Sequence, residues 1–219
     1  KYAFGKKMSR NKYGLPIGIF YDVLTYVKTF TYRMKHYSNL SDEQLMQFIA
    51  KGKEKAFNEL YRRYADKMHR FFYNMLYQDE SLANDFTQEL FLKIINNPKA
   101  FNPKWKFSTW FYTLAKNLCK NEYRRVSRQP QFQDLQENSS IIPATSQLER
   151  EQEQQLLASA IAELEPHHRE CFILRYQQGF NLKVISEILG CPEGTVKSRV
   201  YYATQKIAEQ LRPILNDKN

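Results

Sequence analysis

The 219-residue chain is 42% hydrophobic and holds only 7 glycines and 8 prolines, a composition that favours a helix-rich protein with one large or two small cores. It contains no run of about 18 uncharged apolar residues, which argues against a membrane span and for a soluble protein. The formal net charge of +10 at pH 7 suggests an acidic partner such as nucleic acid.

The chain begins with a basic segment. Residues 1–33 hold seven basic and one acidic side chain, and the sequence from Met34 onward reads like an ordinary protein start. We therefore expect residues 1–37 to be a basic N-terminal extension that is disordered or not native. After it, Ser41 and Gln44 predict a capping box, and the helix that they open is expected to stop at Gly52.

An amphipathic helix is predicted from the apolar spacing between Phe57 and Met75, and a further helix over residues 81–96 has too much apolar surface for one buried stripe. At about 100° per residue its apolar residues fall on two opposite sides. Either this helix is buried all round, or its second side docks on another protein. The first side holds Ala83, Phe86, Leu90 and Ile94, and the second holds Phe91, Leu92 and Ile95 beside Asp85 and Gln88.

Ser108 is a candidate cap for a helix that runs to about Arg128. Its core side is predicted to hold Phe111, Leu114, Ala115 and Leu118, and Trp105, Phe107 and Tyr112 are expected to be at least partly core. The side turned away mixes cations with an aromatic ring, which suits single-stranded nucleic acid because bases stack on rings while phosphates meet charge. An ordinary solvated helix is the plainer alternative. That outer side holds Trp110, Thr113, Asn117, Lys120, Asn121 and Arg124.

Residues 129–150 are rich in Gln, Ser and Asn and lack a sustained period, which predicts a flexible linker. Beyond it, Pro166 breaks an apolar helix pattern and Gly179 is a candidate C-terminal stop. A short helix capped by Asn181, a turn at Gly190 and a final helix with Pro192 at its first position then have helix-turn-helix spacing.

The final helix has a buried side predicted from steps of four and three residues, namely Val196, Val200, Ala203, Ile207 and Leu211. Its opposite side can contact DNA, since Lys197 and Arg199 can meet phosphate or guanine and Ser198 and Gln205 can bond base edges. Residues 151–219 nevertheless hold eight basic and nine acidic side chains, so bulk charge does not favour DNA binding by this segment.

The three cysteines, Cys119, Cys171 and Cys191, form no CxxC pair and suit buried thiols in a reducing, cytoplasmic compartment. His167 and His168 could be imagined as metal ligands with Cys171, but adjacent histidines after a proline are typical of a solvated helix start. Neither a Gly-rich phosphate loop nor an HExxH motif occurs. We expect no catalytic residue, no cofactor and no metal site.

Four stretches together resemble the sigma-70 family of bacterial transcription initiation factors, in its small extracytoplasmic-function (ECF) group. They are AFNELYRRYADKMHRF, DFTQELFLKI, FSTWFYTLAKNLCKNEYRR and LEPHHRECFILRYQQGFNLKVISEILGCPEGTVKSRVYYATQKI. The GTVKSR word also occurs in other helix-turn-helix regulators, whereas its joint occurrence with DFTQELF and FSTWFYTLAKN is far more specific.

The resemblance implies three sets of site residues. The polymerase-binding set is Asp85, Gln88, Glu89, Phe91, Leu92 and Ile95. The set that melts and holds the -10 promoter element is Lys106, Phe107, Ser108, Thr109, Trp110, Thr113, Asn117, Lys120, Asn121 and Arg124. The -35 set on the recognition helix is Gly194, Thr195, Lys197, Ser198, Arg199, Tyr201, Tyr202 and Gln205. Because many relatives carry Arg where this chain has Tyr201, Tyr202 and Thr204, fewer phosphate contacts are expected.

The resemblance also implies an all-α architecture of two small helical domains joined by a flexible linker. The expected divisions are a region 2 domain at 38–128, a linker at 129–150, a region 4 helix-turn-helix domain at 151–213 and a tail at 214–219. The implied partners are core RNA polymerase (beta-prime clamp and beta subunit), promoter DNA and an anti-sigma factor, without stable membrane insertion. The alternative is a stand-alone helix-turn-helix regulator, which would leave the Trp110 helix without a role.

Overall fold

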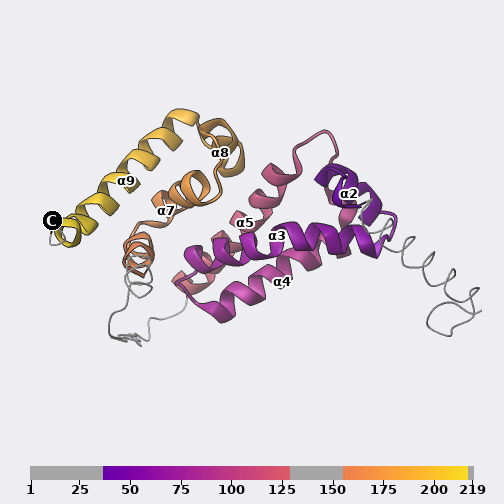
Figure 1. Cartoon of the computed structure of the whole chain (residues 1–219), viewed down its shortest axis with the longest axis horizontal. Helices are drawn as coiled ribbons and strands as arrows, with labels where there is room; N and C mark the ends of the chain where they lie inside the picture. The colour runs from indigo at the N-terminus through magenta and orange to yellow at the C-terminus, as the bar shows by residue number, and fades with distance from the viewer. Residues whose placement is uncertain (1–36, 129–154, 217–219) are drawn as a thin grey trace, which may run out of the picture. The chain divides into compact units, whose positions relative to one another are not determined.

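The computed structural model describes residues 37–128 and 155–216, which form helices and no strand (Figure 1). The all-α prediction is confirmed for these residues. The predicted linker, and the predicted N-terminal extension apart from its last residue, lie outside them. Contacts divide the chain into two compact units, Lys1–Leu60 and Tyr61–Asn219. None of the described helices combines the length and the apolar character that crossing a membrane requires.

The first unit confirms the predicted capping box at α2 (Asp42–Ile49). The Ser41 backbone N–H donates to Gln44 Oε1 at 2.9 Å, and the Gln44 backbone N–H donates to Ser41 Oγ at 3.2 Å. Two N–H groups that the helix itself cannot satisfy are thereby paired. The predicted stop is also confirmed, because Gly52 follows α2 with a φ of 72°.

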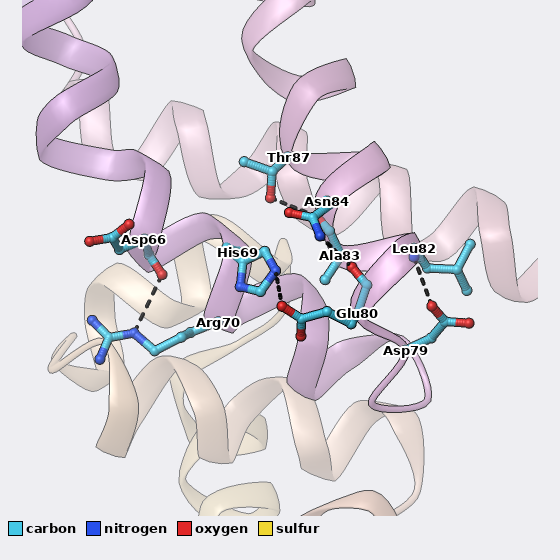
Figure 2. A network of polar contacts seen from close by, with 9 residues as sticks. All are labelled: Asp66, His69, Arg70, Asp79, Glu80, Leu82, Ala83, Asn84 and Thr87. Carbon is cyan, nitrogen blue, oxygen red and sulfur yellow. Dashed lines mark hydrogen bonds and ion pairs between the residues drawn. The ribbon is translucent and has the colours of Figure 1, made fainter.

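In the second unit, the end of α3 (Glu54–Met75) is followed by α4 (Glu80–Asn96). Asp79 caps α4, because its Oδ1 accepts a 2.9 Å hydrogen bond from the Leu82 backbone N–H. Figure 2 shows this cap beside a contact between the two helices, in which His69 Nε2 lies 3.2 Å from Glu80 Oε1. With Asp79 as its cap, α4 begins at Glu80, one residue before the predicted start at residue 81.

The short 3-10 helix η1 (Pro98–Ala100) leads to α5 (Phe107–Arg128). The predicted cap at Ser108 is wrong, because the helix already begins at Phe107 and Ser108 lies in its first turn. Phe107 is fully buried, so core packing determines where this helix begins. The Ser108 hydroxyl lies inside the helix, beyond the position of a capping residue.

An aromatic cluster joins α5 to α3 and α4. It comprises Tyr64, Phe91, Phe101, Phe107, Trp110 and Phe111. The Phe107 and Phe111 rings stack with centroids 5.0 Å apart, and the Tyr64 ring meets each of them edge-on at 5.3 Å. Full burial of one such ring stabilises a fold by about 1.5–3 kcal/mol, so the cluster fixes which side of α5 faces inward.

The turn after α3 is held by a donor from α5. Tyr77 and Gln78 have φ values of 56° and 58°, which end the helix and leave the Met75 carbonyl without a helical partner. That carbonyl accepts a hydrogen bond from the Tyr123 hydroxyl. Farther along the chain, the buried Arg169 donates to the Ala162 carbonyl and, at 2.9 Å, to the Leu164 carbonyl, so its charge is spread over carbonyl oxygens.

The rest of the second unit contains α7 (Pro166–Phe172), the π-helix η2 (Ile173–Gln177), α8 (Leu182–Leu189) and α9 (Glu193–Asn216). The predicted break at Pro166 is confirmed, because this proline opens α7. The π-helix was not predicted, since no residue type marks it in the sequence.

The turn between α8 and α9 has the predicted helix-turn-helix form. Asn181 Oδ1 accepts from the Val184 backbone N–H at 2.9 Å and caps α8, while Gly190 ends it with a φ of 67°. Pro192 precedes α9 where it was predicted to be the first helical residue, and its carbonyl accepts from the Thr195 and Val196 N–H groups. The predicted buried side is confirmed for Val196, Val200, Ala203 and Ile207, and Leu211 is half-buried.

We expect Gly190→Ala to lower the free energy of unfolding by about 1–2 kcal/mol, because the αL conformation strains any residue that carries a Cβ. No other atom lies within 4 Å of a Cβ built at this position, so backbone strain alone is tested. Urea denaturation of the full chain, followed by circular dichroism, measures the change.

Gly194→Ala is the matched control, since Gly194 lies inside α9 and a Cβ there also meets nothing within 4 Å. It should raise the free energy of unfolding by about 0.5–1 kcal/mol, the usual gain for alanine in a helix. If both substitutions changed the free energy of unfolding in the same direction, backbone strain from alanine at position 190 would not explain the result.

Candidate nucleic-acid interfaces

The outward side of α9 carries the residues predicted to contact DNA. Opposite the buried side, Gly194, Lys197, Ser198, Tyr201, Tyr202 and Gln205 are exposed, and Thr195 and Arg199 are half-buried. The structure thus brings all eight predicted residues to one helix, within residues 194–205. A helix with one apolar and one polar side is what insertion into a major groove requires.

The polar groups of this helix differ in how far they are already engaged. The Ser198 hydroxyl donates to the Thr195 carbonyl at 2.9 Å, so its oxygen remains as an acceptor. Arg199 Nη1 lies 3.9 Å from Cys191 Sγ, which holds this half-buried side chain at the turn. Lys197 is exposed, which leaves its ammonium group able to meet a phosphate or a base edge.

Two tyrosines enlarge this surface. Tyr201 and Tyr202 are 59% and 60% exposed, and their ring centroids lie 5.7 Å apart. The Tyr202 ring also lies 6.1 Å from the ring of His168 in α7. Aromatic side chains offer apolar contact to a thymine methyl group, and they add no charge for phosphate.

The outward side of α5 carries a second polar surface. Asn117, Lys120, Asn121 and Arg124 are exposed, as is Lys106 before the helix, while Ser108, Trp110 and Thr113 are half-buried. The Trp110 ring lies 5.2 Å from Phe101 and 5.9 Å from Phe107, between centroids. An aromatic ring beside exposed cations and amides matches the requirements of a single nucleic-acid strand.

Two residues predicted for this surface lie in the core. Phe107 is completely buried and Thr109 is 7% exposed, so neither side chain can contact a nucleic acid in this structure. Both are buried because the first turn of α5 packs in the aromatic cluster.

Trp105 is a surface residue that the sequence reasoning missed. It was expected to be at least partly core, but 63% of its side chain is exposed just before α5. Pro103, Lys104 and Lys106 surround it in the sequence, and such polar, helix-breaking neighbours could have indicated a loop position.

On the second side of α4, five of the six residues predicted to bind polymerase are exposed and one is buried. Leu92 and Ile95 are 53% and 47% exposed, and Asp85, Gln88 and Glu89 are exposed beside them. Phe91 is buried instead, with its ring 4.7 Å from Tyr61 and 5.5 Å from Phe111. A surface of two large apolar side chains rimmed by polar ones is typical of protein contact sites.

Glu165, His167 and His168 bring one possible metal-ligating atom each to within 4.8 Å of one another. Burial and then the neighbouring His167 lower the pKa of His168, while Glu165 raises it. His167 Nε2 already lies 3.3 Å from Glu165 Oε2, and this carboxylate is exposed, as acidic groups without a metal commonly are. The cluster alone does not indicate a metal centre.

Two of the three thiols, those of Cys119 and Cys171, are unsuited to reactivity or metal binding. Cys119 and Cys171 are buried and Cys191 is half-buried, much as predicted. Burial raises the pKa of the Cys119 and Cys171 thiols, which disfavours the thiolate form that acts as nucleophile or ligand.

Comparison with protein families finds two matches in chain order. Residues 60–129 match Sigma-70 region 2, and residues 154–207 match Sigma-70, region 4. Together the two matches span more than half of the chain.

Relatives and solved structures agree with these matches. The chain is 28% identical over 188 residues to the ECF RNA polymerase sigma-E factor of Haemophilus influenzae, covering 80% of this chain and 98% of that protein. It is 29% identical over 187 residues to the Escherichia coli K12 protein of the same name, covering 80% and 97%. The sigma factor RpoE of Bartonella quintana, solved with the anti-sigma factor NepR, aligns with a TM-score of 0.60 at 25% identity over 72% of this chain and 98% of that one.

CnrH, solved in complex with the cytosolic domain of CnrY, shares the fold with a TM-score of 0.61 at 20% identity, over 78% of this chain and 97% of that chain. The helix-turn-helix at α8 and α9 falls within the region 4 match, and α4 and α5 fall within the region 2 match. The chain belongs to the sigma-70 family, as a non-enzymatic ECF RNA polymerase sigma factor with regions 2 and 4 that directs transcription initiation.

Proposed function

We propose that three surfaces of this sigma factor divide the work of initiation. The exposed side of α4 binds the beta-prime clamp of core RNA polymerase, the outward side of α5 holds the opened -10 element, and the outward side of α9 reads the -35 element. The observation that carries the proposal is the pairing of a cationic aromatic surface on α5 with a helix-turn-helix in the same chain. A stand-alone regulator would need only the helix-turn-helix.

We further propose the domain divisions of 38–128 for region 2, 129–150 for the linker and 151–213 for region 4, with residues 1–37 outside both domains and 214–219 as a tail. Tethering two weak DNA readers makes the second contact effectively intramolecular, which raises selectivity without a strongly charged region 4. The beta subunit is a second contact on polymerase, and an anti-sigma factor is a further partner. The place of action is the cytoplasm.

The whole proposal is tested by run-off transcription with purified core polymerase on genomic fragments, followed by mapping of the start sites. Start sites should share two sequence elements at the -10 and -35 positions, and the chain alone should bind these fragments weakly. Tight binding to a palindromic site without polymerase would contradict the division of labour.

Leu92→Asp combined with Ile95→Asp should weaken binding to core polymerase by about 100-fold or more. The double variant loses two apolar contacts and places two charges where the interface excludes water. Fluorescence anisotropy of the labelled chain titrated with core polymerase measures the loss. Both residues are about half exposed, so the helical circular dichroism spectrum should not change.

Val126→Asp is the matched control, since Val126 is also an exposed apolar residue, at 38%, but lies near the end of α5. It should bind core polymerase as the unchanged chain does. An equal loss in the control, or unchanged binding by the double variant, would refute the docking surface on α4.

Lys120→Ala combined with Asn117→Ala should slow promoter opening by about 10-fold or more, because a phosphate contact and an amide contact to the displaced strand are both lost. Fluorescence of 2-aminopurine placed in the -10 element measures opening. Lys53→Ala removes one exposed charge in the first unit and should leave the rate unchanged. Equal slowing by this control would mean that the α5 residues act only through net charge.

Lys197→Ala combined with Ser198→Ala should reduce transcription from a promoter that depends on its -35 element by about 10-fold or more, since base and phosphate contacts of about 1–3 kcal/mol are removed. Binding to core polymerase should be intact. Arg212→Ala removes a charge from the far end of α9 and should have little effect. If polymerase binding falls together with transcription, the pair is structural rather than DNA-reading.

A further inference from the structure

The outward side of α9 exposes more aromatic surface than charge. Tyr201 and Tyr202 are 59% and 60% exposed, while Lys197 is the one exposed cationic side chain between residues 194 and 205. A phosphate is recognised by charge and by hydrogen bonds, so a surface built mainly of rings is poorly suited to follow a DNA backbone. Such a surface suits the apolar group that the major groove displays, which is the C5 methyl group of thymine.

The two rings lie on either side of the polar centre of this surface. At about 100° per residue, Tyr201 and Tyr202 are each about 50° from the line that runs between Ser198 and Gln205. Both rings therefore border the groove when α9 lies in it, and the hydroxyl and the amide between them remain for base edges. The Ser198 oxygen is left as an acceptor, because its hydroxyl donates to the Thr195 carbonyl at 2.9 Å.

The Tyr202 ring has neighbours on two elements. It meets the Tyr201 ring edge-on, with centroids 5.7 Å apart and an interplanar angle of 73°. It also lies 6.1 Å from the ring of the half-buried His168 in α7, which in turn lies 4.1 Å from the His167 ring. A ring with neighbours on two elements has fewer rotamers to lose, so contact with DNA costs less entropy.

Thr204 follows the two tyrosines and adds no charge. It is half-buried, and its hydroxyl donates to the Val200 carbonyl at 2.8 Å. Its Oγ1 also lies 3.5 Å from the hydroxyl of Tyr176 in η2. Among residues 201–204, the two tyrosines are thus the exposed side chains.

We propose that Tyr201 and Tyr202 make the -35 contact selective for thymine. Each ring packs against the C5 methyl group of an A·T pair in the major groove, on whichever strand carries that methyl group. Ser198 and Gln205 bond to neighbouring base edges. This inference rests on the proposed function of α9 at the -35 element, and it adds the base that the helix selects.

Uracil in place of thymine tests the contact, because it removes the methyl group and keeps both the base pair and the hydrogen-bonding groups of the groove. Each thymine of a mapped -35 element, on either strand, is replaced singly by deoxyuridine. Competition measures binding of each fragment to the full chain assembled with core polymerase. At least two replacements should weaken binding by about fourfold each, the effect of one buried methyl group. A -35 element without thymine, or unchanged affinity for every uracil fragment, would overturn the proposal.

Tyr201→Ala and Tyr202→Ala should each abolish the fourfold effect at one of these thymines and keep it at the other. Tyr176→Ala is the matched control and should keep both effects, since Tyr176 is 55% exposed but lies in η2, outside the proposed DNA surface. Thermal melting shows whether each variant is folded, and the uracil measurement on the unchanged chain stands if one is not. Methyl sensitivity that persists in both α9 variants, or that the control also loses, would overturn the proposal.

Tyr201→Phe and Tyr202→Phe separate the ring from its hydroxyl, a group that can bond to a phosphate. Both variants should keep the fourfold effect, because the ring that packs on the methyl group is unchanged. Loss of the effect in either variant would assign recognition to the hydroxyl and contradict the proposal.

Scrambling the whole -35 element separates this inference from the proposed function. If scrambling lowers transcription by about tenfold or more while uracil has no effect, α9 reads the element and only the selection of thymine is refuted. If scrambling has no effect, the proposed function of α9 fails together with this inference.

Discussion

The aromatic cluster at the start of α5 is the constraint on which the region 2 surfaces depend. The ring stack of Phe107 and Phe111, closed by Tyr64 from α3 and Phe91 from α4, fixes how α5 is rotated about its own axis. Because this side is committed to the core, the amides and cations on the opposite side must face solvent. The same cluster takes Phe91 away from the surface of α4, which leaves Leu92 and Ile95 as its exposed apolar residues. One packing arrangement therefore determines both proposed surfaces.

In region 4, a glycine turn sets the direction of the two-sided helix α9. Gly190 sets the angle at which the chain leaves α8, and α9 then buries one side and exposes the other. The segment from residue 151 onward has slightly more acidic than basic side chains. The -35 contact that we propose therefore relies on short-range contacts of Lys197, Ser198 and the two tyrosines, because long-range attraction of the duplex requires a surplus of positive charge.

The sequence predicted the helix caps at Ser41 and Asn181 correctly, because these depend on local chemistry, whereas the predicted cap at Ser108 was wrong. Asn181 and Gly190 act through their own backbone neighbourhood, and both were recognised by residue type alone. Burial was harder to predict, since it depends on which other helices pack nearby. Phe91 was placed by angle on the second side of α4, which was expected either to be buried or to dock on another protein, and rings from two other helices cover it. Trp105 was expected to be at least partly core, yet most of its side chain is exposed. The π-helix Ile173–Gln177 was not predicted, because no residue type marks such a turn in the sequence.

The Trp110 ring shows what such packing does for a surface residue. It lies against Phe101 and Phe107, so its rotamers are restricted although part of the indole still meets solvent. Ordering a free side chain during association costs about 0.5–1.5 kcal/mol, and here folding has already restricted the ring. An incoming base would meet a surface of nearly fixed shape, and the entropy lost on binding would come mainly from the nucleic acid.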